Sequence, residues 1–155
     1  MPVTDRQGLN LAMLPRKGTG HNMKRSVKTV LLVDDEETLM GSLKAGLRVF
    51  FPDIQFEAAL NGNDALRIMQ SRPVDLVVTD IRMPEMDGYE LLSKIRFAST
   101  DVPVIAMSAF ESPEMKETLS DLGVLCFLEK PLSLQELVGA IQEGLRQNDQ
   151  WANQA

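Results

Sequence analysis

One stretch of the sequence indicates how the chain folds: Val77-Val78-Thr79-Asp80-Ile81-Arg82-Met83-Pro84-Glu85-Met86-Asp87-Gly88. The aliphatic run 76–78 predicts a buried strand, and Asp80 follows at its carboxyl end. Pro84 favours extended backbone in the residue before it, so the chain should leave the strand in a turn. Asp87 is a residue type that caps helices, which places a helix start directly after the turn. Open α/β sheets carry their ligand sites at the carboxyl ends of parallel strands, so Asp80 is a candidate functional residue.

Apolar runs typical of buried strands alternate five times with helical patterns along the chain. We expect strands over the ranges 29–33, 54–60, 76–79, 102–107 and 124–128. We expect helices over 37–50, around 65–69, around 89–95, over 111–122 with Gly123 as its C-cap, and over 134–145 with Ser133 as its N-cap. This alternation predicts the flavodoxin-like doubly wound (βα)5 fold, a five-stranded parallel sheet in the order 2-1-3-4-5 with helices on both faces.

Composition and charge limit the classes of function. The 155 residues are 44% apolar and 25% charged, which is enough to bury a core. Residues 1–28 hold six basic residues and one acid (+5), whereas the rest holds 10 basic and 21 acidic residues (−11). A body this acidic argues against direct nucleic-acid binding, which depends on clustered Lys and Arg.

The expected location is the cytoplasm. The single cysteine, Cys126, excludes an intramolecular disulfide and fits a reducing compartment. No apolar run approaches the length of about 20 residues that spans a bilayer, and the N-terminus lacks the apolar core of a signal peptide.

We predict three segments along the chain: a flexible basic extension over 1–26, one domain over 27–147 and a polar tail over 148–155. Met23 begins a run that looks like a natural domain start, so residues 1–22 are expected to be either a dispensable extension or the result of an upstream start choice. With no further domain pattern after the last helix, the chain is expected to act as a stand-alone domain.

Four ordered motifs carry a resemblance to a known family. They are Val30-Leu31-Leu32-Val33-Asp34-Asp35-Glu36, the stretch ending at Gly88, Val104-Ile105-Ala106-Met107-Ser108-Ala109, and Phe127-Leu128-Glu129-Lys130-Pro131. Together they resemble the response-regulator receiver domains of two-component systems. The resemblance covers roughly residues 28 to 147.

The strand order places the polar residues of these motifs at one edge of the sheet. Asp34 and Asp35, then Asp80, Ser108 and Lys130 follow the carboxyl ends of neighbouring strands. Carboxylates this close repel one another and call for a cation or for protonation. Oxygen ligands without His or Cys suit Mg²⁺ rather than zinc.

The resemblance implies a phosphorylation switch fed by a sensor histidine kinase or a phosphotransfer protein. It implies an output surface formed by the fourth helix, fifth strand and fifth helix, which engages an unknown downstream protein. The roles implied are the phosphoacceptor Asp80; the Mg²⁺ ligands Asp34, Asp35, Asp80 and the backbone carbonyl of Arg82; the phosphoryl-binding Ser108, Ala109 and Lys130; the switch residues Ser108 and Phe127; and a cis peptide between Lys130 and Pro131.

Other expectations follow from the same resemblance. The chain should not be an enzyme for external substrates; it should catalyse only its own phosphorylation and slow self-dephosphorylation. Bulky side chains at Arg82 and Phe110 should slow the attack of water on the phosphoryl group. We expect a monomer or a phosphorylation-dependent dimer, with no membrane partner.

Two alternative functions compete with the switch. A metal-dependent phosphohydrolase with an Asp nucleophile usually has a second acid two residues later, and this chain has Arg82 there. A receiver-like interaction module that acts without phosphorylation would be expected to lack an acid, the hydroxyl or the lysine. The sequence retains all of these groups, which favours the switch.

Overall fold

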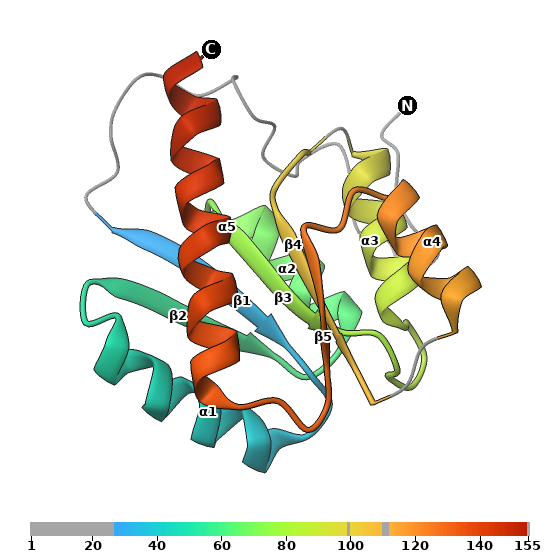
Figure 1. Cartoon of the computed structure of the whole chain (residues 1–155), viewed down its shortest axis with the longest axis horizontal. Coiled ribbons are helices and arrows are strands. Elements are labelled where there is room, and N and C mark those ends of the chain that lie inside the picture. The colour runs from blue at the N-terminus through green and yellow to red at the C-terminus, as the bar shows by residue number, and fades with distance from the viewer. Residues whose placement is uncertain (1–26, 99, 110–111, 155) are drawn as a thin grey trace.

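The computed structural model describes residues 27–98, 100–109 and 112–154, with side chains up to residue 149. The predicted basic extension over 1–26 and the residue Phe110 lie outside this part. Strands and helices alternate along the chain (Figure 1). In chain order they are β1 (Lys28–Val33), α1 (Glu37–Phe50), β2 (Ile54–Ala59), α2 (Gly62–Ser71), β3 (Leu76–Asp80), α3 (Gly88–Phe97), β4 (Val104–Ser108), α4 (Pro113–Asp121), β5 (Cys126–Glu129) and α5 (Leu134–Gln154).

All strand pairs are parallel, and the sheet order is β2-β1-β3-β4-β5, as the sequence predicted. Neighbouring strands are nearly level at their carboxyl ends. Val33 pairs with Thr79, Asp80 with Met107, and Ser108 with Glu129. The residues that end these strands or follow them therefore share one edge of the sheet.

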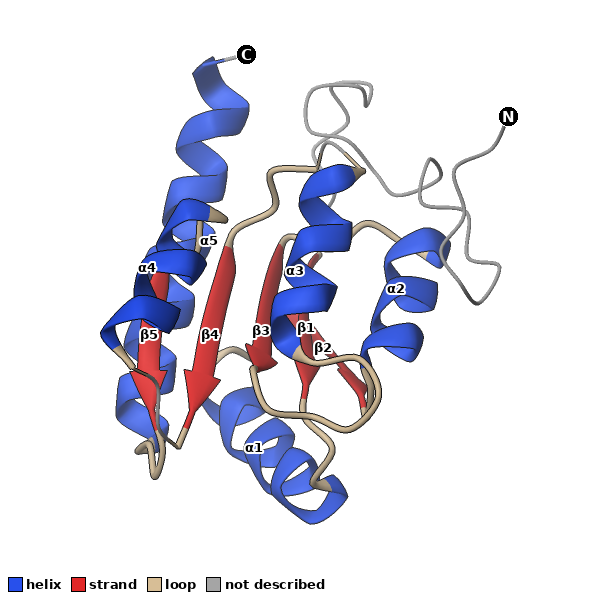
Figure 2. Cartoon of the chain, turned by 90° about the vertical axis from the view of Figure 1, so that its right-hand side faces the viewer, coloured by secondary structure: helices blue, strands red, loops and turns tan. Residues whose placement is uncertain are grey.

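The sheet lies between two layers of helices, with α2, α3 and α4 on one face and α1 and α5 on the other (Figure 2). In β1, Leu31 and Val33 pack into the core beneath α2, α3 and α4. Val30 and Leu32 pack into the core beneath α1 and α5. Both faces of the strand are buried, which explains why β1 and β3 appear as unbroken apolar runs rather than alternating ones.

Local signals in the sequence fix most helix starts. The side chains of Asp87 and Ser133 accept the N–H groups of Glu90 at 2.9 Å and Glu136 at 3.1 Å, so both predicted N-caps are confirmed. The helix predicted from residue 111 begins at Pro113, because Ser112 caps it instead. Two strand starts also lie two residues later than predicted, at positions 104 and 126.

Helix α5 runs to Gln154, well past its expected end at residue 145, so it includes most of the polar tail predicted over 148–155. Lys28 at the start of β1 forms an ion pair with Asp149. Asn148 donates to the buried carboxylate of Asp75 at 3.4 Å. These contacts attach the end of α5 to the amino edge of the sheet and give the polar side chains partners. None of the helices in the part that the structure describes is both long and apolar enough to cross a membrane.

Arg96 near the end of α3 joins two loops at the amino edge of the sheet. Its guanidinium donates to the carbonyls of Leu122 at 2.9 Å and Gly123 at 3.2 Å, where α4 ends. It also donates to the carbonyls of Thr100 at 3.1 Å and Val102 at 2.9 Å, before β4. The left-handed backbone of Gly123 (φ +80°) turns the chain towards this cation.

Replacing Arg96 with Met should lower the free energy of unfolding by about 1–3 kcal/mol, because partly buried carbonyls lose their donor. Urea unfolding would measure the change. The matched control is Arg67→Met, since Arg67 forms an ion pair with Asp64 on the exposed side of α2. That variant should change stability by about 0.5 kcal/mol or less. Equal losses in the two variants would contradict the role given to Arg96.

Candidate functional site

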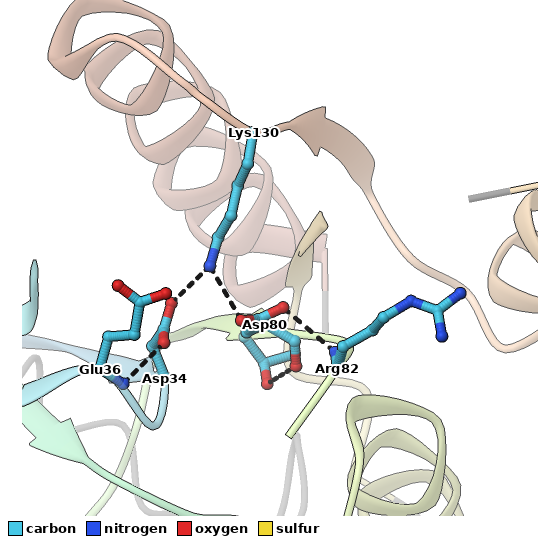
Figure 3. A network of polar contacts seen from close by, with 6 residues as sticks. Asp34, Glu36, Asp80, Arg82 and Lys130 are labelled. Carbon is cyan, nitrogen blue, oxygen red and sulfur yellow. Dashed lines mark hydrogen bonds and ion pairs between the residues drawn. The ribbon is translucent and has the colours of Figure 1, made fainter. Parts of the chain in front are cut away.

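An ion-pair network occupies the carboxyl edge of the sheet. The Nζ atom of Lys130 lies 2.8 Å from Oδ2 of Asp34 and 2.8 Å from Oδ2 of Asp80 (Figure 3). The Asp34 side chain is fully buried, and those of Asp80 and Lys130 are 9% and 18% exposed. The three residues predicted from separate strands therefore meet in one cluster that is open to solvent on one side.

The strand ends and the loops after them position these carboxylates. Asp34 follows β1 and Asp80 ends β3, while Lys130 follows β5. The second oxygen of Asp34 accepts the N–H of Glu36 at 3.0 Å. The second oxygen of Asp80 accepts the N–H of Arg82 at 3.1 Å. Each acid is thus held by a backbone donor on one oxygen and by the ammonium group on the other.

The acidic cluster can hold a divalent cation. Carboxylate oxygens of Asp34, Asp35 and Asp80 lie within 4.8 Å of one another. The donors are all oxygen, and Asp35 is exposed, so water can complete the coordination shell that Mg²⁺ prefers. Three carboxylates and the single ammonium of Lys130 leave two negative charges, which a divalent cation would balance.

The charges in the cluster influence one another. Burial raises the pKa of Asp80 above its usual value, although the ammonium of Lys130 and the Arg82 N–H oppose the change. Burial alone would lower the pKa of Lys130, but its bonds to Asp34 and Asp80 outweigh burial and raise it. Lys130 is therefore positively charged at neutral pH.

The other predicted site residues lie on or directly after the neighbouring strands β4 and β5. Ser108 ends β4, is fully buried, and accepts the N–H of Lys130 on its carbonyl at 2.8 Å. Ala109 follows it and is exposed, whereas Phe127 on β5 is half-buried. The Lys130–Pro131 peptide bond is cis, as predicted.

The side chain of Arg82 points away from the acids (Figure 3). Its Nη2 atom lies 3.9 Å from the sulfur of Met115 on α4. Both residues line an open groove of about 410 Å³ between α4 and the loop after β3, together with Ile81, Met83, Pro84, Asp87 and Tyr89. The guanidinium therefore lies in this groove rather than among the carboxylate oxygens of the acidic cluster.

Gly88 holds the loop after β3 closed, a role that the sequence analysis missed. Its N–H donates to the carbonyl of Ile81 at 2.8 Å. A Cβ atom at this position would lie 2.6 Å from the carbonyl oxygen of Asp80 and 2.8 Å from the Cα of Ile81. The sequence signal was the glycine after a capping aspartate, but it indicated only a helix start.

The family model for the response regulator receiver domain matches residues 30–142. Among similar curated proteins, the probable transcriptional regulator ycf27 of Cyanidium caldarium is 36% identical over 117 residues, covering 76% of this chain and 46% of that protein. The transcriptional regulatory protein GlrR of Escherichia coli K12 is 36% identical over 119 residues, covering 77% of this chain and 26% of that protein. This chain thus spans less than half the length of either relative.

Solved structures of similar proteins also have this fold. A CheY-like response regulator receiver domain protein from Methanospirillum hungatei superposes with a TM-score of 0.74 at 26% identity, covering 81% of this chain and 98% of that one. The chemotaxis protein CheY4 of Vibrio cholerae superposes with a TM-score of 0.71 at 26% identity, covering 77% and 99%. This chain therefore belongs to the response regulator receiver domain family, whose members act in phosphorylation-mediated signalling.

Proposed function

We propose that this chain is a switch activated by phosphorylation of Asp80. The phosphoryl group would come from a sensor histidine kinase or a phosphotransfer protein, with Mg²⁺ bound at the acidic cluster. The observation that carries the proposal is the contact of one ammonium, that of Lys130, with both Asp34 and Asp80 at the sheet edge. A carboxylate oxygen of Asp35 lies within 4.8 Å of oxygens of the same two acids, so the three could share one cation.

In the proposed reaction a carboxylate oxygen of Asp80 attacks the phosphorus of the donor in line with the leaving group. The new O–P bond makes an acyl phosphate, and the bond from phosphorus to the donor's leaving atom breaks. Lys130 would bind one phosphoryl oxygen, while the Ser108 hydroxyl and the Ala109 N–H bind the others. Bound Mg²⁺ would neutralise charge on the phosphoryl oxygens, held by Asp34, Asp35, Asp80 and the backbone carbonyl of Arg82.

The signal would then pass from Ser108 to Phe127. A phosphoryl group on Asp80 draws the hydroxyl of Ser108 inward, and the ring of Phe127 fills the vacated space. The surface of α4, β5 and α5 changes with it and engages a downstream protein in the cytoplasm. This is a population shift between two packings, and Phe127 has no phenol hydroxyl to contribute to recognition.

Mass spectrometry of the intact protein tests the proposal. After incubation with acetyl phosphate and Mg²⁺, the wild type should gain one phosphoryl group, and it should gain none without Mg²⁺. Asp80→Asn should gain none under either condition. Asp53→Asn, which removes an exposed acid just before β2, should behave as the wild type.

The remaining outcomes contradict the proposal in different ways. A gain on Asp80→Asn would place the phosphoryl group on another residue. A wild type that gains nothing, while it binds a partner unmodified, would favour the interaction module that acts without phosphorylation.

The lifetime of the acyl phosphate tests the proposed shielding of the phosphoryl group by Arg82. We expect Arg82→Gly to lose the phosphoryl group about threefold faster or more, which corresponds to about 0.65 kcal/mol off the barrier to water attack. Decay of the phosphorylated mass after removal of the donor gives the rate. Arg67→Gly on the exposed side of α2 is the control. An unchanged lifetime in Arg82→Gly would contradict the shielding role.

A further inference from the structure

A cation lies over the ring of the predicted switch residue. The Nζ atom of Lys116 on α4 is 5.0 Å from the centroid of the Phe127 ring on β5. Helix α4 crosses in front of β5 on this face of the sheet (Figure 2). Lys116 is exposed and Phe127 is half-buried, so the contact sits at the surface. An ammonium at this distance is attracted by the negative face of an aromatic ring.

The neighbouring strand offers small side chains beside the ring. Phe127 pairs with Ala106 of β4, and Ser108 lies two residues further along on the same face. Ala106 and Ser108 are both fully buried. A movement of the ring over Ala106 towards Ser108 would therefore bury more of it, away from solvent.

The ammonium of Lys116 cannot follow such a movement. A charged group that leaves water without a partner of opposite charge loses its hydration at high cost. Among the residues that the structure describes, no carboxylate forms a salt bridge with Lys116. An inward movement of Phe127 would therefore break the cation–ring contact rather than carry it along.

We propose that Lys116 is a latch that holds Phe127 in its resting position and so opposes the phosphorylated packing. The inference rests on the proposed function, in which Phe127 moves inward when Asp80 is phosphorylated. A contact made only in the resting packing lowers the population of the packing in which Phe127 has moved inward. It thereby lowers the rate at which Asp80 accepts a phosphoryl group.

The initial rate of phosphoryl gain from acetyl phosphate with Mg²⁺ tests the latch. Lys116→Gln should react about two- to fivefold faster than the wild type, the range available from a cation–π contact at an exposed site. Lys116→Arg keeps a cation over the ring and should react at the wild-type rate. Lys44→Gln on α1, on the other face of the sheet, is the control. It shows how far the loss of one positive charge from the protein alone changes the rate with an anionic donor.

A double-mutant cycle separates the latch from a general effect on α4. In a Phe127→Leu background, Lys116→Gln should no longer change the rate, because there is no ring to hold. The latch is overturned if Lys116→Gln reacts at or below the rate of Lys44→Gln, or if its acceleration persists with Leu at position 127. A wild type that accepts no phosphoryl group overturns the proposed function, and the latch falls with it. Normal acceptance with no acceleration overturns the latch alone.

Discussion

Replacing Gly88 with Ala is expected to destabilise the protein by about 3 kcal/mol, in the upper part of the range for overpacked sites. The new Cβ would lie 2.6 Å from the Asp80 carbonyl oxygen and 2.8 Å from the Cα of Ile81. Both atoms belong to the backbone, so no side-chain rotation can relieve the overlap. The loop after β3 has to open, and its opening moves Asp80 itself.

The same substitution should therefore also slow phosphoryl acceptance by Asp80. Urea unfolding and the initial rate of mass gain measure the two effects. Gly139→Ala is the matched control, because a Cβ on this exposed residue of α5 meets nothing within 4 Å. That variant should gain about 0.5–1 kcal/mol of stability from the better helix former. A Gly88→Ala protein as stable as the wild type would contradict the close approach.

Replacing Lys130 with Met should have the second large effect. Asp34 and Asp80 would remain together in a mostly buried site without a positive partner. Removing one partner of a buried pair costs about 3–5 kcal/mol. Because Lys130 is 18% exposed and the cluster is open on one side, we expect about 2–3 kcal/mol. The variant should also accept the phosphoryl group far more slowly, since one phosphoryl oxygen would lose its cation.

Added Mg²⁺ and a lower pH should each reduce the loss of stability in Lys130→Met. A bound divalent cation replaces the missing positive charge and stabilises the folded state that binds it. Burial already raises the pKa of Asp80 in the wild type, and without Lys130 this pKa should rise further. The folded variant then binds a proton more tightly than the unfolded chain does. Its deficit should shrink as the pH falls through the folded pKa of Asp80 and return as the pH rises again.

Two variants show whether the effect belongs to this cluster. Lys28→Met removes an exposed ion pair with Asp149 and should cost at most about 1 kcal/mol. Asp34→Asn in the Lys130→Met background should recover stability, because it removes one of the two repelling charges. If the double variant were as unstable as Lys130→Met, charge repulsion would not be the cause.

Local rules of sequence were sufficient for the order of the elements. The apolar runs before Asp34 and Asp80 were predicted as strands because only the middle of a parallel sheet buries both faces of a strand. Asp87 and Ser133 were predicted as caps because their side chains reach N–H groups three residues away. Such contacts span a single turn, so the sequence shows them directly.

The main site residues were also predictable, for a topological reason. In a doubly wound sheet the carboxyl ends of neighbouring strands meet at one edge, so Asp34, Asp80 and Lys130 had to lie near one another. The structure adds that one ammonium touches both acids.

Contacts between atoms far apart in the chain become visible in the folded protein but not in the sequence. Asn148 and Asp75 are 73 residues apart, and their contact helps to hold α5 where a polar tail was expected. The same holds for the close approach of Gly88 to the Asp80 carbonyl. It also holds for the position of Lys116 over Phe127, which depends on how α4 packs against β5. Residue propensities act locally, so the order of residues is enough to predict which elements form, and the parallel strand order then indicates which edge of the sheet holds the candidate site. The partners of Arg96, Lys116 and the end of α5 follow from side-chain packing between elements, which no local pattern encodes.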